Sequence, residues 1–196
     1  MKRFLDISFA LFVIIVLWWV LVIAWIAVKI TTPGPGIFSH KRVGKNKIPF
    51  TIYKFRTMYE GTKQAGTHEV TADNVTKVGR FLRKTKIDEL PQVWNILKNE
   101  ISLIGARPCL PTQHTLIDAR TELSVFDEIG GITGWAQVNG RNTISWDQKF
   151  EMDVWYVDNQ SFFLDIKILW LTLKKVIKQD GISHNNHVTM EKFKGN

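Results

Sequence analysis

The run ISFALFVIIVLWWVLVIAWIAV, residues 7–28, decides how the rest of the chain can fold. It contains no charged residue, and Ser8 is its only hydroxyl residue. As a helix rising ~1.5 Å per residue it would be about 33 Å long, close to the hydrocarbon thickness of a bilayer. A buried core helix is rarely apolar on every side for so long, and a cleaved signal peptide has a shorter apolar region and a small-residue cleavage site. The sequence therefore predicts a membrane-embedded helix over residues 1–30.

Basic residues on both sides of this segment bear on its topology. Lys2 and Arg3 precede it, and a second group follows it: Lys29, Lys41, Arg42, Lys45 and Lys47. Because basic flanks favour the cytoplasmic side, we expect a re-entrant helix whose two ends are both cytoplasmic. Such a bend usually needs a breaker such as Pro, and the centre here reads Leu17-Trp18-Trp19, so a straight crossing stays open as the alternative.

The remaining chain predicts one cytosolic domain over residues 31–181 and a polar tail over residues 182–196. The run TTPGPG, residues 31–36, ends the apolar helix with breakers. Residues 37–43 and 50–55 are rich in alternating β-branched and aromatic residues on either side of a turn, which predicts a β-hairpin. Because most of the later patterns are helical, the expected fold class is α+β, mainly helical.

Helical patterns cover residues 77–84, about 90–97, 146–157 and 164–178, and the run GGITGWAQVNGRN, residues 130–142, predicts a Gly-rich loop. In the last helix one face collects these apolar residues: Ile166, Leu169, Trp170, Leu173 and Ile177. That pattern is typical of a helix packed on a core or lying on a membrane surface. We therefore expect interfacial amphipathic helices around the cytosolic part.

Composition narrows the kind of partner. The chain has 196 residues and a net charge of +8. Residues 29–86 carry 13 Lys and Arg against 3 Asp and Glu, so the positive charge is concentrated directly after the apolar segment. An anionic partner is indicated: nucleic acid, lipid headgroups or a phosphorylated substrate. Cys109 is the only cysteine, which excludes an intrachain disulfide and fits a reducing compartment.

Two adjacent carboxylates, Asp88 and Glu89, follow this basic run in TKIDELPQVW, residues 85–94. One interpretation is structural: Thr85 or Asp88 caps the next helix, and both acids favour its positive N-terminal end. The other interpretation is catalytic, with Asp88 as a nucleophile that forms an acyl-phosphate and is kept ionised by its basic neighbours. Glu89 would then hold Mg²⁺ or manage a proton.

A carboxylate that attacks phosphate needs cations nearby, and the chain offers several. Arg107 in GARP and Arg141 in NGRN lie beside glycines, and the planar guanidinium suits phosphate because it donates paired hydrogen bonds. Arg83 belongs to the basic run itself. The motif YKFRTM adds Lys54 and Arg56 at the end of the hairpin, where pairing with acids is an equally simple explanation. Taken singly, each loop arginine is equally well explained as a surface residue in a turn.

Six motifs occur in order along residues 2–181: KRFLDI, TTPGPGIF, YKFRTM, GRFLRKTKIDELPQVWNILKNEISLIGARP, GITGWAQVNGR and SFFLDIKILWLTLKKV. Together they resemble the bacterial sugar transferases of the small monotopic phosphoglycosyl transferase type. The Asp-Glu-Leu-Pro-Gln run ahead of Gly-x-Arg-Pro is the most specific part of this resemblance. Two stretches depart from it: Trp18-Trp19 stands where Ser-Pro is usual, and Ile129-Gly130-Gly131 stands where Arg-Pro-Gly is usual.

The resemblance implies transfer of a sugar-1-phosphate from a UDP-sugar to undecaprenyl phosphate, with UMP released, as the first membrane step of bacterial glycoconjugate synthesis. It implies that Asp88 attacks the β-phosphorus to form a covalent phosphosugar intermediate, which the lipid phosphate then displaces. Mg²⁺ is the implied cofactor, and we expect Asp88 and Glu89 to be its ligands. The residues expected to bind substrate phosphates are Arg107, Arg83, Arg141 and Arg56. The implied location is the cytoplasmic face of the bacterial inner membrane.

The alternative function is a membrane-anchored binder of nucleic acid or anionic lipid without catalysis. The basic run supports that reading, but a binder gains nothing from acids inside its positive surface. We therefore expect membrane lipid and no nucleic acid among the partners. The oligomeric state stays open, and the expectation for the donor stops at a UDP-sugar.

Overall fold

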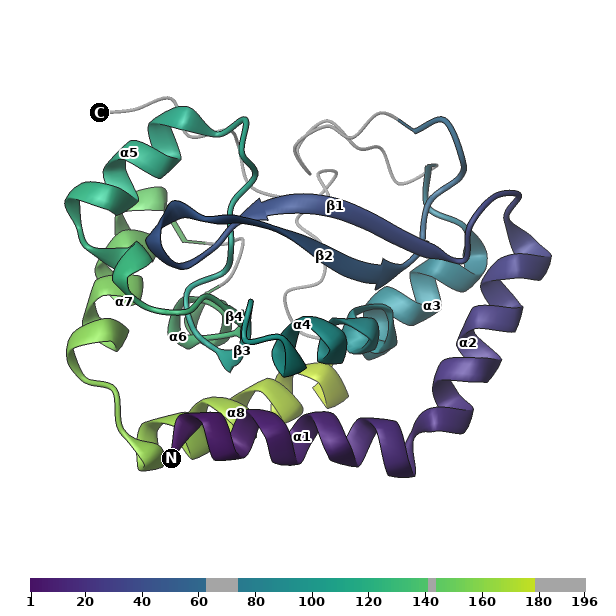
Figure 1. Cartoon of the computed structure of the whole chain (residues 1–196), viewed down its shortest axis with the longest axis horizontal. Coiled ribbons are helices and arrows are strands. Elements are labelled where there is room, and N and C mark those ends of the chain that lie inside the picture. Colours follow the sequence, from purple (N-terminus) through teal and green to yellow (C-terminus); the bar gives the residue numbers. More distant parts are fainter. Residues whose placement is uncertain (63–73, 141–143, 179–196) are drawn as a thin grey trace.

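Two helices form the long apolar segment, and a break at Leu17 bends one against the other. In the computed structural model, which describes residues 1–62, 74–140 and 144–178, α1 spans Lys2–Val16 and α2 spans Trp18–Thr31. The two axes differ by 69° (Figure 1). No single helix of the described residues is long and apolar enough to cross a membrane, whereas the bent pair together is, by length and composition. The expected bend is confirmed.

The bend forms without proline because its inner side packs against the protein. Ala10 and Val13 of α1 are fully buried in a cluster that Leu17 and Leu21 also join, together with residues of the hairpin and of α4 (Val93–Leu97). Leu17 leaves the helical region, with φ −105° and ψ 12°. Trp18 and Trp19 are each more than half exposed, so the bend does not bury them against the protein.

A β-hairpin crosses the molecule above α1 (Figure 1). Its strands are β1 (Ile37–Val43) and β2 (Pro49–Phe55), which pair antiparallel around the short 3₁₀ helix η1 (Lys45–Lys47). The predicted hairpin is therefore confirmed. The outer edge of β2 does not stay open, because Asn95 bonds to two of its backbone groups, accepting from Tyr53 N at 3.2 Å and donating to Thr51 O at 2.6 Å.

Three short helices follow and contain the basic run and the acid pair. They are α3 (Lys77–Thr85), the 3₁₀ helix η4 (Ile87–Gln92) and α4. Thr76 caps α3 by accepting from Gly79 N at 2.8 Å. Lys86 then adopts the left-handed conformation, with φ 63°, and so turns the chain between α3 and η4. The predicted second helix is thus a 3₁₀ helix in its first part and an α-helix in its second.

A second, very small sheet joins distant parts of the chain. β3 (Ser102–Ile104) pairs in parallel with β4 (Gly131–Thr133), and α6 (Trp135–Asn139) follows directly. The prediction of a Gly-rich loop here is wrong for most of the run. Gly131 allows the two backbones of this sheet to approach closely, because a Cβ at Gly131 would lie 2.0 Å from Gly105 N.

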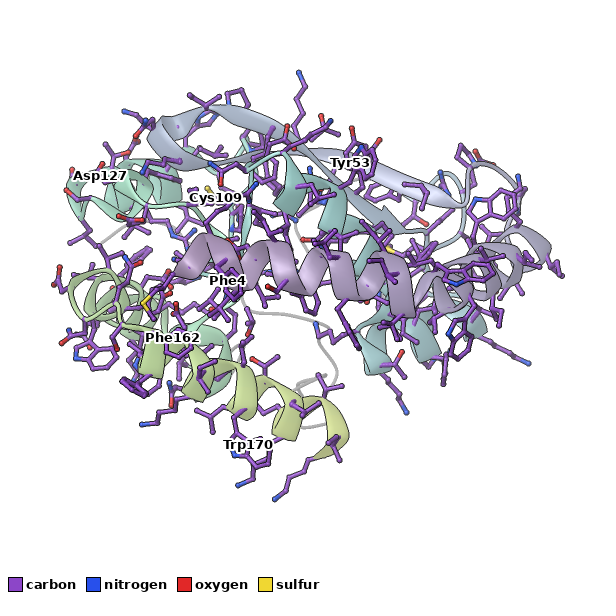
Figure 2. All side chains as sticks on the ribbon, turned by 60° about the horizontal axis from the view of Figure 1, so that its bottom comes forward. Phe4, Tyr53, Cys109, Asp127, Phe162 and Trp170 are labelled. Carbon is purple, nitrogen blue, oxygen red and sulfur yellow. The ribbon has the colours of Figure 1, made fainter. Side chains whose placement is uncertain are left out.

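The remaining helices complete the molecule. They are α5 (His114–Glu122), the 3₁₀ helix η5 (Val125–Asp127), α7 (Trp146–Asp158) and α8 (Phe162–Lys178). In α8 Ile168 is buried, whereas four of the residues predicted to share an apolar face are exposed: Ile166, Trp170, Leu173 and Ile177. Figure 2 shows Phe4 of α1 with Phe162 and Trp170 of α8 on the same side of the molecule. The core-packing alternative is therefore wrong for this face of α8. The predicted tail over residues 182–196 lies outside the described residues.

Candidate active site

Asp88 and Glu89 lie in the first turn of η4, and both are buried although they carry charge. Asp88 is 7% exposed and Glu89 is 6% exposed. The left-handed Lys86 lets η4 start in a new direction, so that its first turn packs against β2. Of the structural interpretation, the cap by Thr85 or Asp88 is wrong, whereas both acids do lie at the N-terminal end of the helix. The cap position belongs to Lys86, which makes no side-chain cap, and the Thr85 hydroxyl donates instead to Phe81 O at 3.0 Å.

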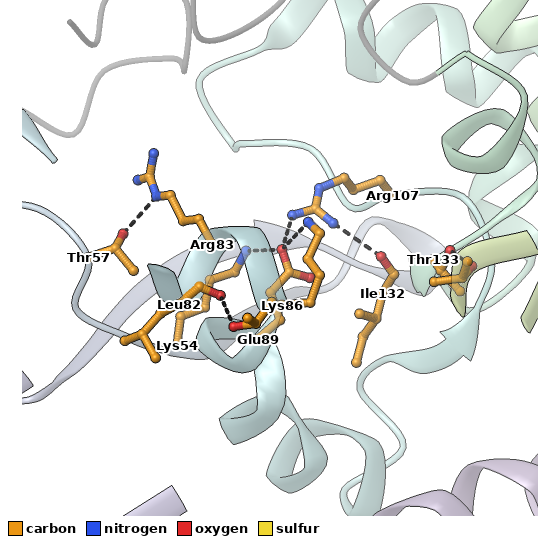
Figure 3. A network of polar contacts seen from close by, with 11 residues as sticks. Lys54, Thr57, Leu82, Arg83, Lys86, Glu89, Arg107, Ile132 and Thr133 are labelled. Atoms are coloured by element: carbon orange, nitrogen blue, oxygen red, sulfur yellow. Dashed lines mark hydrogen bonds and ion pairs between the residues drawn. The ribbon is translucent and has the colours of Figure 1, made fainter. Parts of the chain in front are cut away.

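Glu89 is surrounded by positive charge (Figure 3). Its Oε1 accepts from Arg107 Nη2 at 2.9 Å and from Lys54 Nζ at 3.1 Å, and Lys86 Nζ lies 3.7 Å away. Burial alone would raise the pKa of Glu89, but Arg107 and the two lysines together hold it well below its usual value. Glu89 is thus a fixed negative charge that gathers three cations around one oxygen.

Asp88 has the opposite environment. Its Oδ1 is buried and makes no hydrogen bond to any described residue. Burial and the neighbouring Glu89 raise the pKa of Asp88, and Lys54, Lys86 and Arg83 lower it by less. The basic neighbours favour the carboxylate form, as expected, but burial, the largest cause, and Glu89 together outweigh them in the net shift of the Asp88 pKa. An oxygen without a hydrogen-bond donor keeps its lone pairs available, which favours Asp88 Oδ1 as a nucleophile.

Arg107 comes from the loop after β3 and reaches η4 from the other side. Nη1 donates to Ile132 O at 3.1 Å while Nη2 bonds to Glu89 (Figure 3). The Glu89 carboxylate raises the pKa of Arg107. The side chain is still 40% exposed, so it can meet a ligand from solvent while it remains bound to Glu89.

The other predicted arginines are not all at this site. Arg83 lies beside the acid pair, and its Nε donates to Thr57 Oγ1 at 2.9 Å. Arg56 is turned elsewhere: its Nε donates to Pro35 O at 2.8 Å and its guanidinium covers the Phe38 ring. Among the described residues it makes no ion pair with either acid. The predicted Arg141 lies outside the described residues.

Three residues at the site are absent from the predicted set of site residues: Lys54, Arg42 and Gln92. Burial lowers the pKa of Lys54 to about 8 and that of Arg42 to about 10. Gln92 is fully buried, and its Nε2 has no partner among the described residues. All three line a small cavity together with Arg107. The sequence pointed to Lys54 through YKFRTM, with pairing to an acid as one explanation, and its ion pair with Glu89 confirms that explanation. No pattern in the sequence distinguishes Gln92 from other polar residues as a member of the site.

Comparison with known proteins shows the family of the chain. The family model described as bacterial sugar transferase matches residues 1–179. An uncharacterized sugar transferase of Bacillus subtilis, EpsL, is 45% identical over 195 residues, which cover the whole chain and 96% of EpsL. The undecaprenyl-phosphate galactose phosphotransferase of Salmonella typhimurium is 33% identical, and the UDP-glucose:undecaprenyl-phosphate glucose-1-phosphate transferase of Escherichia coli is 36% identical. These matches cover 92% and 89% of the chain, but only 41% and 40% of the two longer proteins. The chain belongs to the bacterial sugar transferase family.

Proposed function

We propose that this chain transfers a sugar-1-phosphate from a UDP-sugar to undecaprenyl phosphate and releases UMP. The names of the Salmonella and Escherichia coli relatives describe reactions of this type. The observation that carries the proposal is the buried Asp88, whose Oδ1 has no partner among the described residues, next to a glutamate that gathers three cations. A nucleophile and a positive environment for phosphate are thus adjacent in one turn of η4.

The reaction has two displacement steps at one phosphorus atom. A carboxylate oxygen of Asp88 bonds to the β-phosphorus, the bond to the bridging oxygen of the diphosphate breaks, and UMP leaves with that oxygen. A phosphate oxygen of the lipid then attacks the same phosphorus, and the aspartate oxygen leaves, so the carboxylate is restored. Splitting the transfer in this way is the usual advantage of covalent catalysis.

The cations have a separate task. An anionic nucleophile that approaches an anionic diphosphate meets charge repulsion, and guanidinium and ammonium groups offset it. Arg107 has the exposed surface for this contact, while Glu89 orients it. Because Glu89 also engages Lys54 and Lys86, these cations are not free for a long polyanion, which disfavours the nucleic-acid binder.

The acid pair also fits a magnesium ion of the kind that substrate phosphates complete. Among the described residues there is no group of three acid, histidine or cysteine side chains that could hold a metal by itself. Mg²⁺ commonly takes only one or two carboxylates and fills its other positions with phosphate oxygens and water. The unpartnered Oδ1 of Asp88 and the second oxygen of Glu89 are the available ligands. When bound, the ion would neutralise charge on the diphosphate.

We also propose that α1 and α2 enter the membrane from the cytoplasmic side and return to it. The N-terminal turns of α1 are tied to the cytosolic part: the Arg3 guanidinium donates to Ile96 O and Leu97 O at the end of α4. Asp6 is buried and accepts from Ser102 Oγ at 2.9 Å and from Leu103 N at 2.7 Å. The exposed apolar residues of α1, α2 and α8 support contact with lipid.

The test is a screen of UDP-sugars for UMP release, followed by a search for the covalent intermediate. Incubation with an active UDP-sugar alone should add the mass of one sugar-phosphate to the peptide that contains Asp88. Asp88→Asn should abolish both the adduct and the transfer, because an amide cannot form the acyl-phosphate. Asp118→Asn is the matched control, since Asp118 is exposed on α5. Normal turnover of Asp88→Asn, or an adduct on another peptide, would contradict the proposal.

A further inference from the structure

The loop that carries Arg107 is held by other elements at four consecutive carbonyl groups. Ala106 O accepts from Gly131 N at 2.9 Å, and Cys109 O accepts from Val43 N at 3.0 Å. The two central carbonyls are held by arginine side chains: Arg42 donates to Pro108 O at 3.1 Å, and Arg120 donates to Arg107 O at 2.6 Å. A loop outside helices and strands needs such partners for its buried carbonyls.

Arg120 is itself fixed by a buried ion pair. Its Nη2 donates to Asp153 Oδ2 at 2.8 Å, and the two side chains are 6% and 4% exposed. Arg120 comes from α5 and Asp153 from α7, so the pair connects two helices behind the loop. Burial raises the pKa of Asp153, which Arg120 partly offsets. Because desolvation offsets much of the attraction, a buried pair adds little net stability, although removing one partner leaves an unpaired charge.

We propose that Arg120 and Asp153 are positioning residues that set the orientation of Arg107. The contacts form one series: Asp153 fixes Arg120, Arg120 holds the Arg107 carbonyl, and the Arg107 guanidinium meets Glu89 and Ile132 O. With its backbone held on one side and its guanidinium held on the other, Arg107 has one position relative to η4. The expected effect on the rate of transfer rests on the proposed function. The expected effect on the position of Arg107 does not.

A double-mutant cycle separates positioning from general stability. Arg120→Lys and Asp153→Asn should each lower kcat/KM for UMP release by about tenfold or more, since a small displacement of a phosphate-binding group is costly. Combined with Arg107→Lys, either change should add little to the loss that Arg107→Lys causes alone, because effects that act through one residue are not additive. Additive losses, or near-normal activity of Arg120→Lys, would overturn the proposal.

Tyr156→Phe is the matched control. It removes the hydrogen bond from Tyr156 to Asp165, at 2.7 Å, and so weakens the contact between α7 and α8 without touching the Arg107 loop. Its effect on kcat/KM should add to that of Arg107→Lys. If Arg120→Lys and Asp153→Asn both fail to fold, the pair is required for the fold itself and the specific positioning role is refuted.

Hydrogen exchange tests the geometry without any turnover. In Arg120→Lys the amides of Gly131 and Val43, which bond to the loop carbonyls, should exchange faster, while the rest of α7 should keep its protection. Tyr156→Phe should leave both amides unchanged. If the wild-type chain releases no UMP from any UDP-sugar, the proposed function fails, while exchange still decides the positioning role. Unchanged exchange at both amides would refute it.

Discussion

Asp88 and Glu89 are neighbours in sequence, yet the fold gives them opposite acid–base properties. Glu89 has three cations around Oε1 and a pKa well below its usual value. Asp88 is buried beside the anionic Glu89, and both effects raise its pKa. Two carboxylates whose environments differ in this way suit two different tasks, one as a fixed charge and one as the reacting group.

The raised pKa of Asp88 predicts the acid side of the pH–rate profile. The proposed attack by Asp88 needs the carboxylate form, and its raised pKa means that it takes up a proton at a higher pH than an exposed aspartate. The acid limb of kcat/KM, measured from about pH 4 to about pH 8, should therefore lie above the usual Asp value. Lys54→Met removes a cation that lowers the pKa of Asp88, so it should move this limb to higher pH.

Glu89→Gln provides the opposite change. It removes the negative charge that raises the pKa of Asp88, so its residual activity should show an acid limb at lower pH. Lys41→Met, on the exposed side of β1, should leave the limb in place. The pH–rate profile reports the coupled titration of Asp88 and Glu89. If Lys54→Met and Glu89→Gln moved the acid limb in the same direction, the assignment of this limb to Asp88 would be contradicted.

Arg107→Lys keeps the positive charge and loses the planar fork. Lys cannot bond to Glu89 and Ile132 O with the present geometry, so we expect kcat/KM to fall by about 1–3 kcal/mol in transition-state stabilisation. Arg56→Lys is the control, because Arg56 bonds to Pro35 O away from the acid pair and should change kcat/KM little. Equal effects of the two substitutions would mean that Arg107 is only a turn residue.

At the scale of elements, α3 lies close to the end of the hairpin because Gly79 has no side chain. A Cβ on Gly79 would lie 2.0 Å from Thr57 O, and Thr76 N already donates to the same oxygen at 3.1 Å. The close approach of α3 to Thr57 also brings Arg83 within hydrogen-bond distance of Thr57 Oγ1. In the sequence Gly79 merely weakens a helical pattern, whereas in the fold it permits the contact between two elements.

Gly79→Ala should therefore destabilise the protein although alanine favours helices. The helix propensity gain is about 1 kcal/mol, and overpacking against backbone costs about 1–3 kcal/mol, so we expect a net loss of up to about 2 kcal/mol in unfolding free energy. Denaturant unfolding in detergent measures it. Lys84→Ala, at an exposed position of the same helix, should be neutral or slightly stabilising. A Gly79→Ala protein as stable as wild type would show that α3 can move away at little cost.

At the scale of the whole molecule, the two ends of the apolar segment are tied to the same body. Arg3 and Asp6 bind the start of α1 to α4 and β3, and the chain after α2 continues into the hairpin. A straight crossing would put Arg3 and Asp6 on the far side of the membrane from their partners. Breaking these buried contacts is costly, which favours the re-entrant form.

Cysteine labelling tests this topology. In a Cys109→Ser background, a single cysteine inserted before Lys2 should resist an impermeant thiol reagent in intact spheroplasts and react after lysis. A cysteine in place of Lys41, on the hairpin, is the control that is cytoplasmic in both topologies. Labelling of the N-terminal cysteine in intact spheroplasts, with the control still protected, would establish a straight crossing.

The sequence by itself determined the features that depend on local pattern. The apolar segment, the β-hairpin and the α3 pattern are encoded by hydrophobic periodicity and by Pro and Gly punctuation within each stretch. The acid pair and Arg107 were recognisable because a motif keeps its order and spacing along the chain. None of these features needs a contact between distant residues.

Only the tertiary structure decided how these parts meet. The bend at Leu17 depends on packing against the hairpin and α4. Lys54 meets Glu89 and Arg56 does not, because β2 ends at Phe55 and Arg56 bonds to Pro35 O instead. The short parallel pair of β3 and β4 brings Ile132 O to Arg107 across 25 residues of sequence. The opposite pKa shifts of the acid pair follow from burial and from cations supplied by other segments. Such contacts join residues far apart in the chain, and local pattern carries no information about them.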